Sequence, residues 1–467
     1  MTNKKIVLGQ VKEPTLFEHV APVFLTDDTI NERKEKLLKE MKNSNLDAVV
    51  IYADKEHGGN FEYLTGFIPR FEEGLLVVEA SGKCTVILGN ENLKMAAVSR
   101  IEVTLKHSPL FSLPNQPMDN DVALEDIFKE IGLDKQQKIG LVGWKMFTTT
   151  RHDPKGFFDI PYFIVSALLN CLTENSEVVN AAHLFIGGDA GVRTINNANE
   201  IAHYEYGANL ASSCMLNAMN AVDVGVTEAE LGAHLTAEGQ TNTVVTIAAT
   251  GQRFEKANVY PTHKKVQLGD PLSMTTAFKG GLSSRTGFVV ETEDQLPTNQ
   301  KDYLERVAKP YYNAIVHWLE TIKVGMEGQV IYDAVEEIFP KEKYHWHLNP
   351  GHLVSDEEWM SSPIYADSRE TIKSGMIFQI DIIPSIKGYT GVSAEECVAI
   401  ADVQLQQTIE TQYPELWDRI VARRAYIKNE LNIELADEVL PLSNTVAYLR
   451  PFYLAKEQAL LVSKKKD

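Results

Sequence analysis

The chain has 467 residues, of which 44% are hydrophobic and 9% aromatic. Domains commonly contain about 100–200 residues, so this length predicts two domains with substantial apolar cores. The formal net charge of −19 would repel phosphate backbones and anionic headgroups, and we therefore expect neither nucleic acid nor a membrane surface as a partner.

The N-terminal segment and the cysteines predict a cytoplasmic protein. The segment MTNKKIVLGQVKEP lacks the apolar core of a signal peptide. No apolar run approaches the roughly 18–20 residues of a membrane-spanning helix. The cysteines are far apart and form no CxxC pair, which is typical of reduced core residues and not of a disulfide framework or a zinc site.

The first part of the chain alternates helix and strand signals. Residues 29–32 have the spacing of a capping box, and Leu37, Leu38 and Met41 follow as a helical apolar stripe. Apolar strands are predicted at 46–52, at 138–144 and on both sides of a Ser-Gly-Lys turn, with another helix near 124–131. This alternation predicts an open α/β sheet domain.

A Gly- and Asn-rich stretch at 186–198 predicts a domain boundary. After it, helical patterns are expected from 199 to about 222, from 227, and over 304–322, with strand-like runs between and after them. Helices grouped with antiparallel strands predict an α+β domain. One more helix is expected near 414–430, followed by a Pro-punctuated tail.

The segment 376–400 contains the most informative polar residues. If its two strands form a hairpin centred on Gly388, Asp381 lies directly opposite Glu395, with Cβ atoms about 4.5–5.5 Å apart. Two carboxylates this close on an apolar sheet need a cation or a shared proton. The alternative is that Glu395 and Glu396 are ordinary surface acids at an exposed strand end.

Two other segments carry candidate groups. His345, His347 and His352 lie within eight residues, which could indicate a metal site or an aromatic-rich loop, although the usual ligand spacings are absent. Ser283 and Ser284 could be imagined as nucleophiles, but no Gly-x-Ser-x-Gly elbow surrounds them. Walker A and GxGxxG phosphate-binding patterns are absent as well.

The order of these segments resembles the creatinase, prolidase and aminopeptidase P family. NERKEKLLKEMKNSNLDAVVIYADKEHGGNFEYLTGF resembles its N-terminal domain, and residues from about 193 to 402 resemble its catalytic domain. The resemblance implies an α/β N-terminal domain and an α+β C-terminal domain with the pita-bread fold. The implied ranges are 1–185 for the N-terminal domain, 193–405 for the catalytic-type domain and 406–467 for a helical extension.

Metallopeptidases of this family hold two metal ions with two Asp, one His and two Glu. His352 matches the ligand His, and Asp381 and Glu395 stand where the two Glu are usual. Thr275 stands in place of the first Asp, and residues 280–284 offer no acid for the second. The resemblance also places Asn258 where a catalytic His is usual, and Trp359 where a substrate-binding His is usual.

One His and two acids are too few for two divalent ions, so we expect no metal cofactor; if a single divalent metal is bound, His352, Asp381 and Glu395 would hold it. We predict His352, Asp381 and Glu395 as catalytic residues, with His263 as an alternative proton carrier. The residues expected to contact substrate are Asn258, His263, Arg285, Trp359 and His347.

Three functions are compatible with these residues. The first is metal-independent hydrolysis of a C–N bond in a small amide, amidine or Xaa-Pro peptide-like substrate, since creatinase is similar in lacking both Asp ligands. The second is an Xaa-Pro peptidase with a single atypical metal, and the third is a non-catalytic peptide-binding protein. A small molecule or short peptide is the expected partner, and the resemblance also implies a homodimer.

Overall fold

The chain folds into two compact units in the computed structural model, which describes residues 4–188, 191–257 and 259–464. The smaller unit is Leu25–Thr194, and the larger unit combines Met1–Phe24 with Ile195–Asp467. Residues 189–190, inside the stretch predicted as a domain boundary, lie outside the described residues, as does Asn258.

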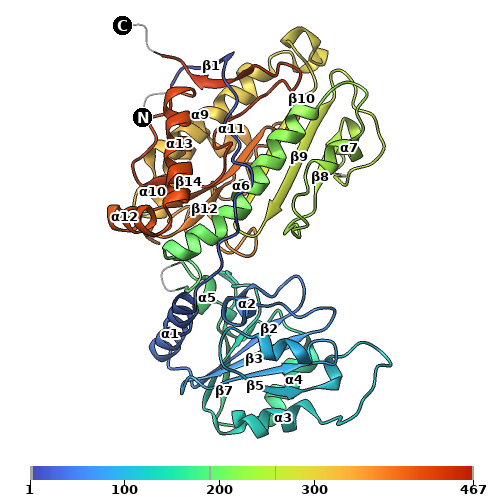
Figure 1. Cartoon of the computed structure of the whole chain (residues 1–467), viewed down its shortest axis with the longest axis vertical. Helices are drawn as coiled ribbons and strands as arrows, with labels where there is room; N and C mark the ends of the chain where they lie inside the picture. The colour runs from blue at the N-terminus through green and yellow to red at the C-terminus, as the bar shows by residue number, and fades with distance from the viewer. Residues whose placement is uncertain (1–3, 189–190, 258, 465–467) are drawn as a thin grey trace. The chain divides into compact units, whose positions relative to one another are not determined.

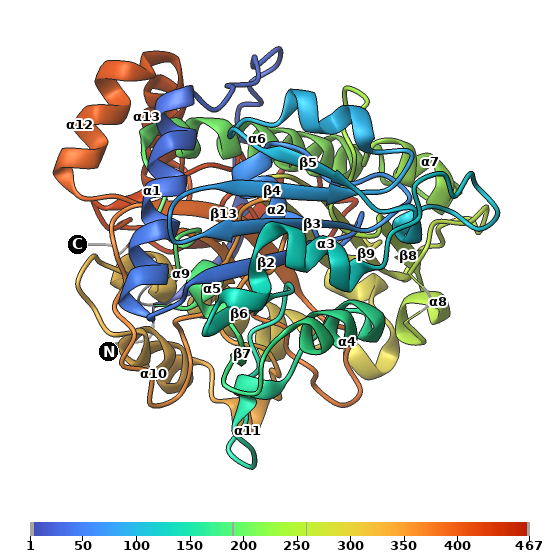
Figure 2. The same cartoon turned by 90° about the horizontal axis from the view of Figure 1, so that it is seen from below.

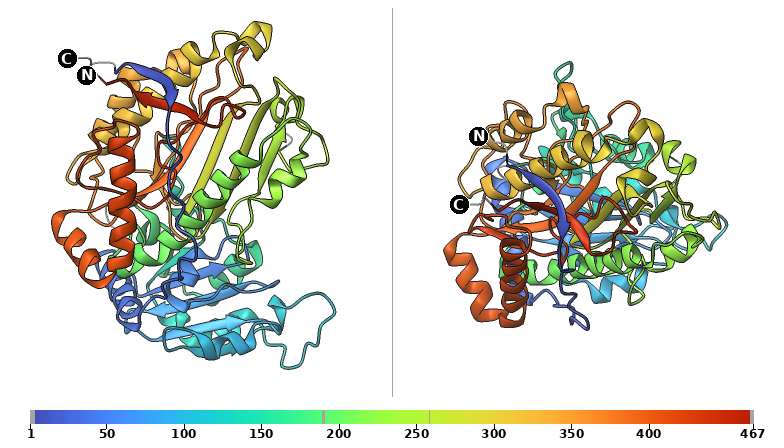
Figure 3. Two further views of the ribbon diagram at one scale, coloured as in Figure 1. Left: turned by 45° about the horizontal axis from the view of Figure 1, so that its top comes forward. Right: turned by 90° about the horizontal axis from the view of Figure 1, so that it is seen from above.

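The first residues of the chain belong to the larger unit, which differs from the predicted N-terminal range of 1–185. The reason is a pairing between the chain's two ends. Strand β1 (Ile6–Gln10) lies beside β15 (Gln458–Val462) in Figure 3, and the two strands pair antiparallel with Leu8 opposite Leu460.

The smaller unit contains a six-stranded sheet in the order β5 (Thr104–His107), β4 (Cys84–Leu88), β3 (Gly74–Glu79), β2 (Ala48–Ala53), β6 (Lys138–Val142) and β7 (Glu177–Asn180). Strands β2, β6 and β7 are parallel, and β3 is antiparallel to both of its neighbours. Apolar side chains of α3 (Leu124–Ile131) and α4 (Tyr162–Cys171) pack on one face of this sheet (Figure 2). The expected α/β organisation is therefore present.

Helix α1 (Asp27–Asn43) begins earlier than predicted, because Thr26 and not Thr29 is its N-cap. The Thr26 hydroxyl accepts a hydrogen bond from the Thr29 amide at 3.2 Å. The predicted apolar stripe is present, and Leu37 and Met41 are buried. Shorter helices α2 (Gly59–Thr65) and α5 (His183–Ile186) complete the smaller unit.

The larger unit contains a seven-stranded sheet in which β11 (His352–Leu353), β12 (Ile377–Ile380), β13 (Ser393–Ile400), β10 (Gly281–Phe288), β9 (Pro271–Phe278) and β8 (Ile247–Thr250) lie in this order. All of these neighbours pair antiparallel. The seventh strand, β14 (Val439–Pro441), pairs with the end of β13. The tail predicted as a helical extension thus also supplies two strands, β14 and β15.

Helix α6 (Ala198–Ala221) lies across β9 and β10 (Figure 1). It begins with a capping box in which Asn197 and Glu200 each accept a hydrogen bond from the other's amide. Gly207 allows the close approach, since a Cβ atom there would lie 1.8 Å from the Lys279 carbonyl oxygen. Helix α6 thereby packs closely against the turn between β9 and β10.

The remaining helices of the larger unit are α7 (Glu228–Ala233), α8 (Gln252–Glu255), α9 (Lys309–Thr321), α10 (Gly328–Ile338), α11 (Lys341–Tyr344), α12 (Val403–Gln412) and α13 (Pro414–Asn429). The capping box predicted at Thr227 opens α7, and a π-helical turn at Leu304–Ala308 precedes α9. None of the helices in the described part of the chain combines the length and apolar character needed to cross a membrane.

Candidate functional site

The sheet of the larger unit aligns four polar positions in one row. Thr275 on β9 lies opposite Ser284 on β10, and Ser284 lies opposite Glu395 on β13. The register of β12 against β13 pairs Ile380 with Glu396, so the next position brings Asp381 opposite Glu395. This is the register expected from a hairpin centred on Gly388.

Asp381 and Glu395 are buried, with exposed fractions of 4% and 7%, and Glu396 is fully buried, so the alternative of ordinary surface acids is wrong for both Glu395 and Glu396. Burial raises the pKa of Glu395 to about 7, and the charge of Glu358 acts in the same direction, whereas a hydrogen bond from Ser393 lowers it. Burial also raises the pKa of Asp381 well above its ordinary value, and repulsion from Glu395 and Glu358 adds to this shift. The two acids favour a shared proton near neutral pH.

His352 stands on β11 beside this pair and is fully buried. Its Nε2 atom lies 3.7 Å from Asp381 Oδ2 and 3.1 Å from Glu358 Oε1. The ring stacks on Trp359, with centroids 4.0 Å apart and planes inclined by 27°. Gly351 precedes it with φ of +127°, a left-handed backbone that admits the turn into β11.

Two buried polar atoms of this cluster have no hydrogen-bond partner within the described part of the chain: His352 Nε2 and Asp381 Oδ1. The approach of Glu358 to His352 therefore lacks the alignment of a hydrogen bond. Buried polar atoms are nearly always satisfied, so unpartnered ones on adjacent side chains indicate a place for a ligand or water. The arrangement suits a group with several N–H donors, or a water molecule between the imidazole and the carboxylates.

Hydroxyl groups occupy the rest of the row, and Ser393 adds another from the next position on the same face of β13, opposite Thr286. Thr275 Oγ1 lies 2.9 Å from Ser284 Oγ, and Ser393 Oγ lies 3.1 Å from Ser284 Oγ. Ser393 Oγ is also 2.9 Å from Glu395 Oε1. We call Thr275, Ser284 and Ser393 the hydroxyl ladder. It connects the far side of the β9–β10 hairpin to the carboxyl pair.

These donors do not fit the two-metal centre that the family resemblance implies. The described residues contain no group of three or more His, Cys, Asp or Glu side chains placed to hold a metal ion. Thr275 and Ser284 offer neutral hydroxyls, which supply none of the negative charge that two adjacent divalent ions require.

Among the predicted substrate-contacting residues, Trp359 joins the cluster, whereas Arg285 lies elsewhere. Arg285 points to the opposite face of β10, because its neighbour Ser284 occupies the face of Glu395 and side chains alternate along a strand. Its guanidinium is fully buried and pairs with Glu396 at 2.6 Å. Arg285 thus forms a buried ion pair on the face of the sheet opposite to Glu395 and does not join the cluster.

His263 and His347 are exposed, and neither belongs to the buried cluster around His352. Asn258, also predicted to contact substrate, lies outside the described residues. The cluster also contains residues that the sequence did not single out. Glu358 precedes Trp359 in a loop, and Tyr311 on α9 accepts a hydrogen bond from the Ala394 amide at 2.9 Å. The sequence signal that could have indicated Glu358 is its position directly before Trp359, which was expected at the site.

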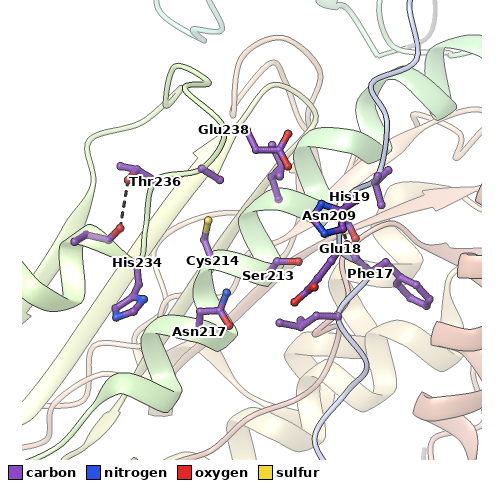
Figure 4. A pocket seen from close by; sticks show the side chains of 15 residues that line it. Phe17, Glu18, His19, Asn209, Ser213, Cys214, Asn217, His234, Thr236 and Glu238 are labelled. Atoms are coloured by element: carbon purple, nitrogen blue, oxygen red, sulfur yellow. Dashed lines mark hydrogen bonds between the residues drawn. The ribbon is translucent and has the colours of Figure 1, made fainter.

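A separate pocket of about 470 Å³ lies over α6 (Figure 4). Asn209, Ser213 and Asn217 line it from one face of the helix, and His234 and Glu238 line it from the segment after α7. Its lining includes none of His352, Asp381 and Glu395. This pocket is distinct from the buried cluster.

Comparison with known proteins identifies the fold and the family. One family model, described as metallopeptidase family M24, matches residues 202–402, and another, the creatinase/prolidase N-terminal domain, matches residues 33–152. No curated protein matches the sequence. The chain thus has a creatinase-type N-terminal domain and a pita-bread C-terminal domain, as predicted.

Solved structures of Xaa-Pro peptidases share this fold at low sequence identity. An Xaa-Pro dipeptidase from Bacillus anthracis is 16% identical, with a TM-score of 0.61 over 80% of this chain and 96% of its own. The prolidase from Pyrococcus horikoshii OT3 is 19% identical, with a TM-score of 0.60 over 79% and 96%. An X-Pro aminopeptidase from Thermotoga maritima is 18% identical, with a TM-score of 0.57 over 79% and 95%. The chain belongs to the creatinase, prolidase and aminopeptidase P family, which is a family of hydrolases.

Proposed function

We propose that the chain hydrolyses a C–N bond in a small amide, amidine or Xaa-Pro peptide-like substrate without a two-metal centre. The observation that carries this proposal is the buried Asp381–Glu395 pair beside His352, with an unpartnered atom on both the acid and the imidazole. Membership of a hydrolase family supports the reaction class. The single-metal peptidase is disfavoured because neither Thr275 nor Ser284 adds charge to the donor set.

Each residue of the cluster has a role in this reaction. Glu395 has a pKa of about 7 and can take a proton from water near neutral pH, as a general base should. The water oxygen then adds to the carbon as the C–N bond breaks, and His352 gives a proton to the departing nitrogen. Asp381 binds and orients the N–H groups of the substrate, and Trp359 holds the imidazole plane.

The test uses wild-type protein dialysed against EDTA and a panel of alanyl-proline, glycyl-proline, small amides and small amidines, with released amine measured by mass spectrometry. We expect turnover of at least one compound, and its loss in Glu395→Gln and His352→Ala. Glu410→Gln removes an exposed acid from α12 and should leave turnover unchanged. Unchanged turnover in both site variants would refute the proposal, and binding without turnover would identify a non-catalytic peptide-binding protein.

The cytoplasmic location and the homodimer expected from the resemblance stay predictions. Sedimentation analysis of the 52.2 kDa chain would test the second, because a dimer has twice this mass.

A further inference from the structure

Two residues of the hydroxyl ladder, Thr275 and Ser284, occupy the sheet positions at which a two-metal site would need acids. Thr275 is the residue that matches the first Asp of the family's metallopeptidases. The β9–β10 register identifies the second position, because Ser284 lies directly opposite Thr275 and directly opposite Glu395. Both side chains are nearly buried, with exposed fractions of 7% and 5%. The backbone frame of five ligand positions is therefore complete, although two of its side chains are not acids.

The ladder is also internally satisfied. The Thr275 and Ser284 hydroxyls are hydrogen-bonded to each other, and the Ser393 hydroxyl can donate its one proton either to Ser284 Oγ or to Glu395 Oε1. None of these oxygens appears among the buried atoms that lack a partner. The unpartnered atoms of the site lie on the other side of the row, at His352 and Asp381. The ladder thus needs no cation to complete its bonding.

The charge balance leads to the same conclusion. Two divalent ions carry four positive charges, whereas Asp381, Glu395 and the neighbouring Glu358 can supply at most three negative charges. Burial makes the charges of Asp381 and Glu395 costly, and the neutral ladder does nothing to offset repulsion between two ions. Aspartate in place of Thr275 and Ser284 would give the row four carboxylates, counting Asp381 and Glu395.

We propose that the hydroxyl ladder of Thr275, Ser284 and Ser393 replaces the family's metal centre, and that Thr275 and Ser284 alone separate this site from one that binds divalent metal. Hydrogen bonds among the ladder hydroxyls take the place of metal–ligand bonds, and the Ser393 hydroxyl connects the ladder to Glu395. This inference does not depend on which bond the chain cleaves. Turnover by metal-stripped protein tests the proposed function, and metal binding tests the ladder.

The next pair of residues on the same face of the β9–β10 hairpin provides a matched control. Thr286 lies opposite Ser273, and the Thr286 hydroxyl donates to the Ser273 hydroxyl at 3.0 Å. Both residues are buried and share the face of Thr275 and Ser284, since they are two positions away on their strands. The double variant S273D/T286D therefore adds the same charge to the same hairpin, in the next row, where Thr286 lies opposite Ser393 and not opposite Glu395.

The experiment titrates Co²⁺ into EDTA-stripped protein and follows visible absorption and calorimetric heat. We expect no tight binding by the wild type, and binding at least about 100-fold tighter in T275D/S284D, since adding ligands to an otherwise preformed site governs metal affinity. Bound Co²⁺ should also raise the melting temperature of T275D/S284D. S273D/T286D should behave like the wild type.

Three results would overturn the inference. One is a wild type that binds one or two Co²⁺ ions as tightly as T275D/S284D. Another is a folded T275D/S284D, judged by circular dichroism, that binds no tighter than the wild type. The third is equal binding by S273D/T286D. If the double variant does not fold, the single variant Ser284→Asp, expected to bind with intermediate affinity, and the wild-type titration decide the question.

Discussion

Glu395 and Glu396 are adjacent on β13 but face opposite sides of the sheet. We therefore predict that replacing each of them with Gln changes the free energy of unfolding in opposite directions. Burial raises the pKa of Glu395 from 4.5 to about 7, so the folded chain holds a proton that the unfolded chain releases. The resulting stability is fully present below about pH 4.5 and is lost as the pH rises through about 7. At about 1.4 kcal/mol per pKa unit, the difference is about 3 kcal/mol.

Glu395→Gln keeps the shape of the side chain and removes its ionisation. We expect the variant to resemble the wild type at pH 4.5 and to exceed its free energy of unfolding at pH 8 by up to about 3 kcal/mol. Glu396→Gln should instead destabilise the chain throughout this range by about 3–5 kcal/mol, because it leaves the buried guanidinium of Arg285 without its carboxylate.

The assay is guanidinium denaturation followed by tryptophan fluorescence at both pH values. It reports mainly on the larger unit, because only Trp144 among the five tryptophans lies in the smaller unit. A Glu395→Gln variant that is less stable than the wild type at pH 8 would refute the account of a buried carboxyl pair without a compensating cation. Equal effects of the two substitutions would refute the assignment of the two faces.

Three further predictions concern the site and its support. Trp359→Ala should lower kcat by about 10- to 100-fold with little change in circular dichroism, because the imidazole of His352 loses its stacking partner; Trp359→Phe should retain most activity. The ratio kcat/KM should rise with pH up to about 7 as Glu395 ionises, and a pH-independent ratio between pH 5 and 8 would contradict its role as base. Gly207→Ala should destabilise the larger unit by about 1–3 kcal/mol or more, measured by thermal unfolding, since its Cβ would meet the carbonyl of Lys279.

The features that the sequence predicted well depend on local periodicity. Alternation along two strands with a glycine turn was enough to place Asp381 opposite Glu395, because strand side chains repeat every two residues. The same alternation argues against Arg285 as a substrate contact, since it follows Ser284 by one residue and must face the other way. The prediction for Arg285 took its position from the family motif without testing its face.

Other features depend on contacts that no local pattern records. The pairing of β1 with β15 joins the two ends of the chain, so neither strand reveals its partner. Glu358 lies in an irregular loop, where spacing does not determine direction, and only the fold brings it within 3.1 Å of His352. The identity of Ser284 as the second ligand position likewise required the pairing of three strands.

The most direct test of a metal-independent hydrolase is the ratio of kcat/KM for EDTA-stripped protein to that of the same protein supplied with Mn²⁺, for the compound turned over fastest. The proposed function predicts a ratio near one, because in it the side chains of His352, Asp381 and Glu395 bind the substrate and move the protons. A ratio below about 0.1, which corresponds to more than about 1.4 kcal/mol of lost transition-state stabilisation, would contradict the account.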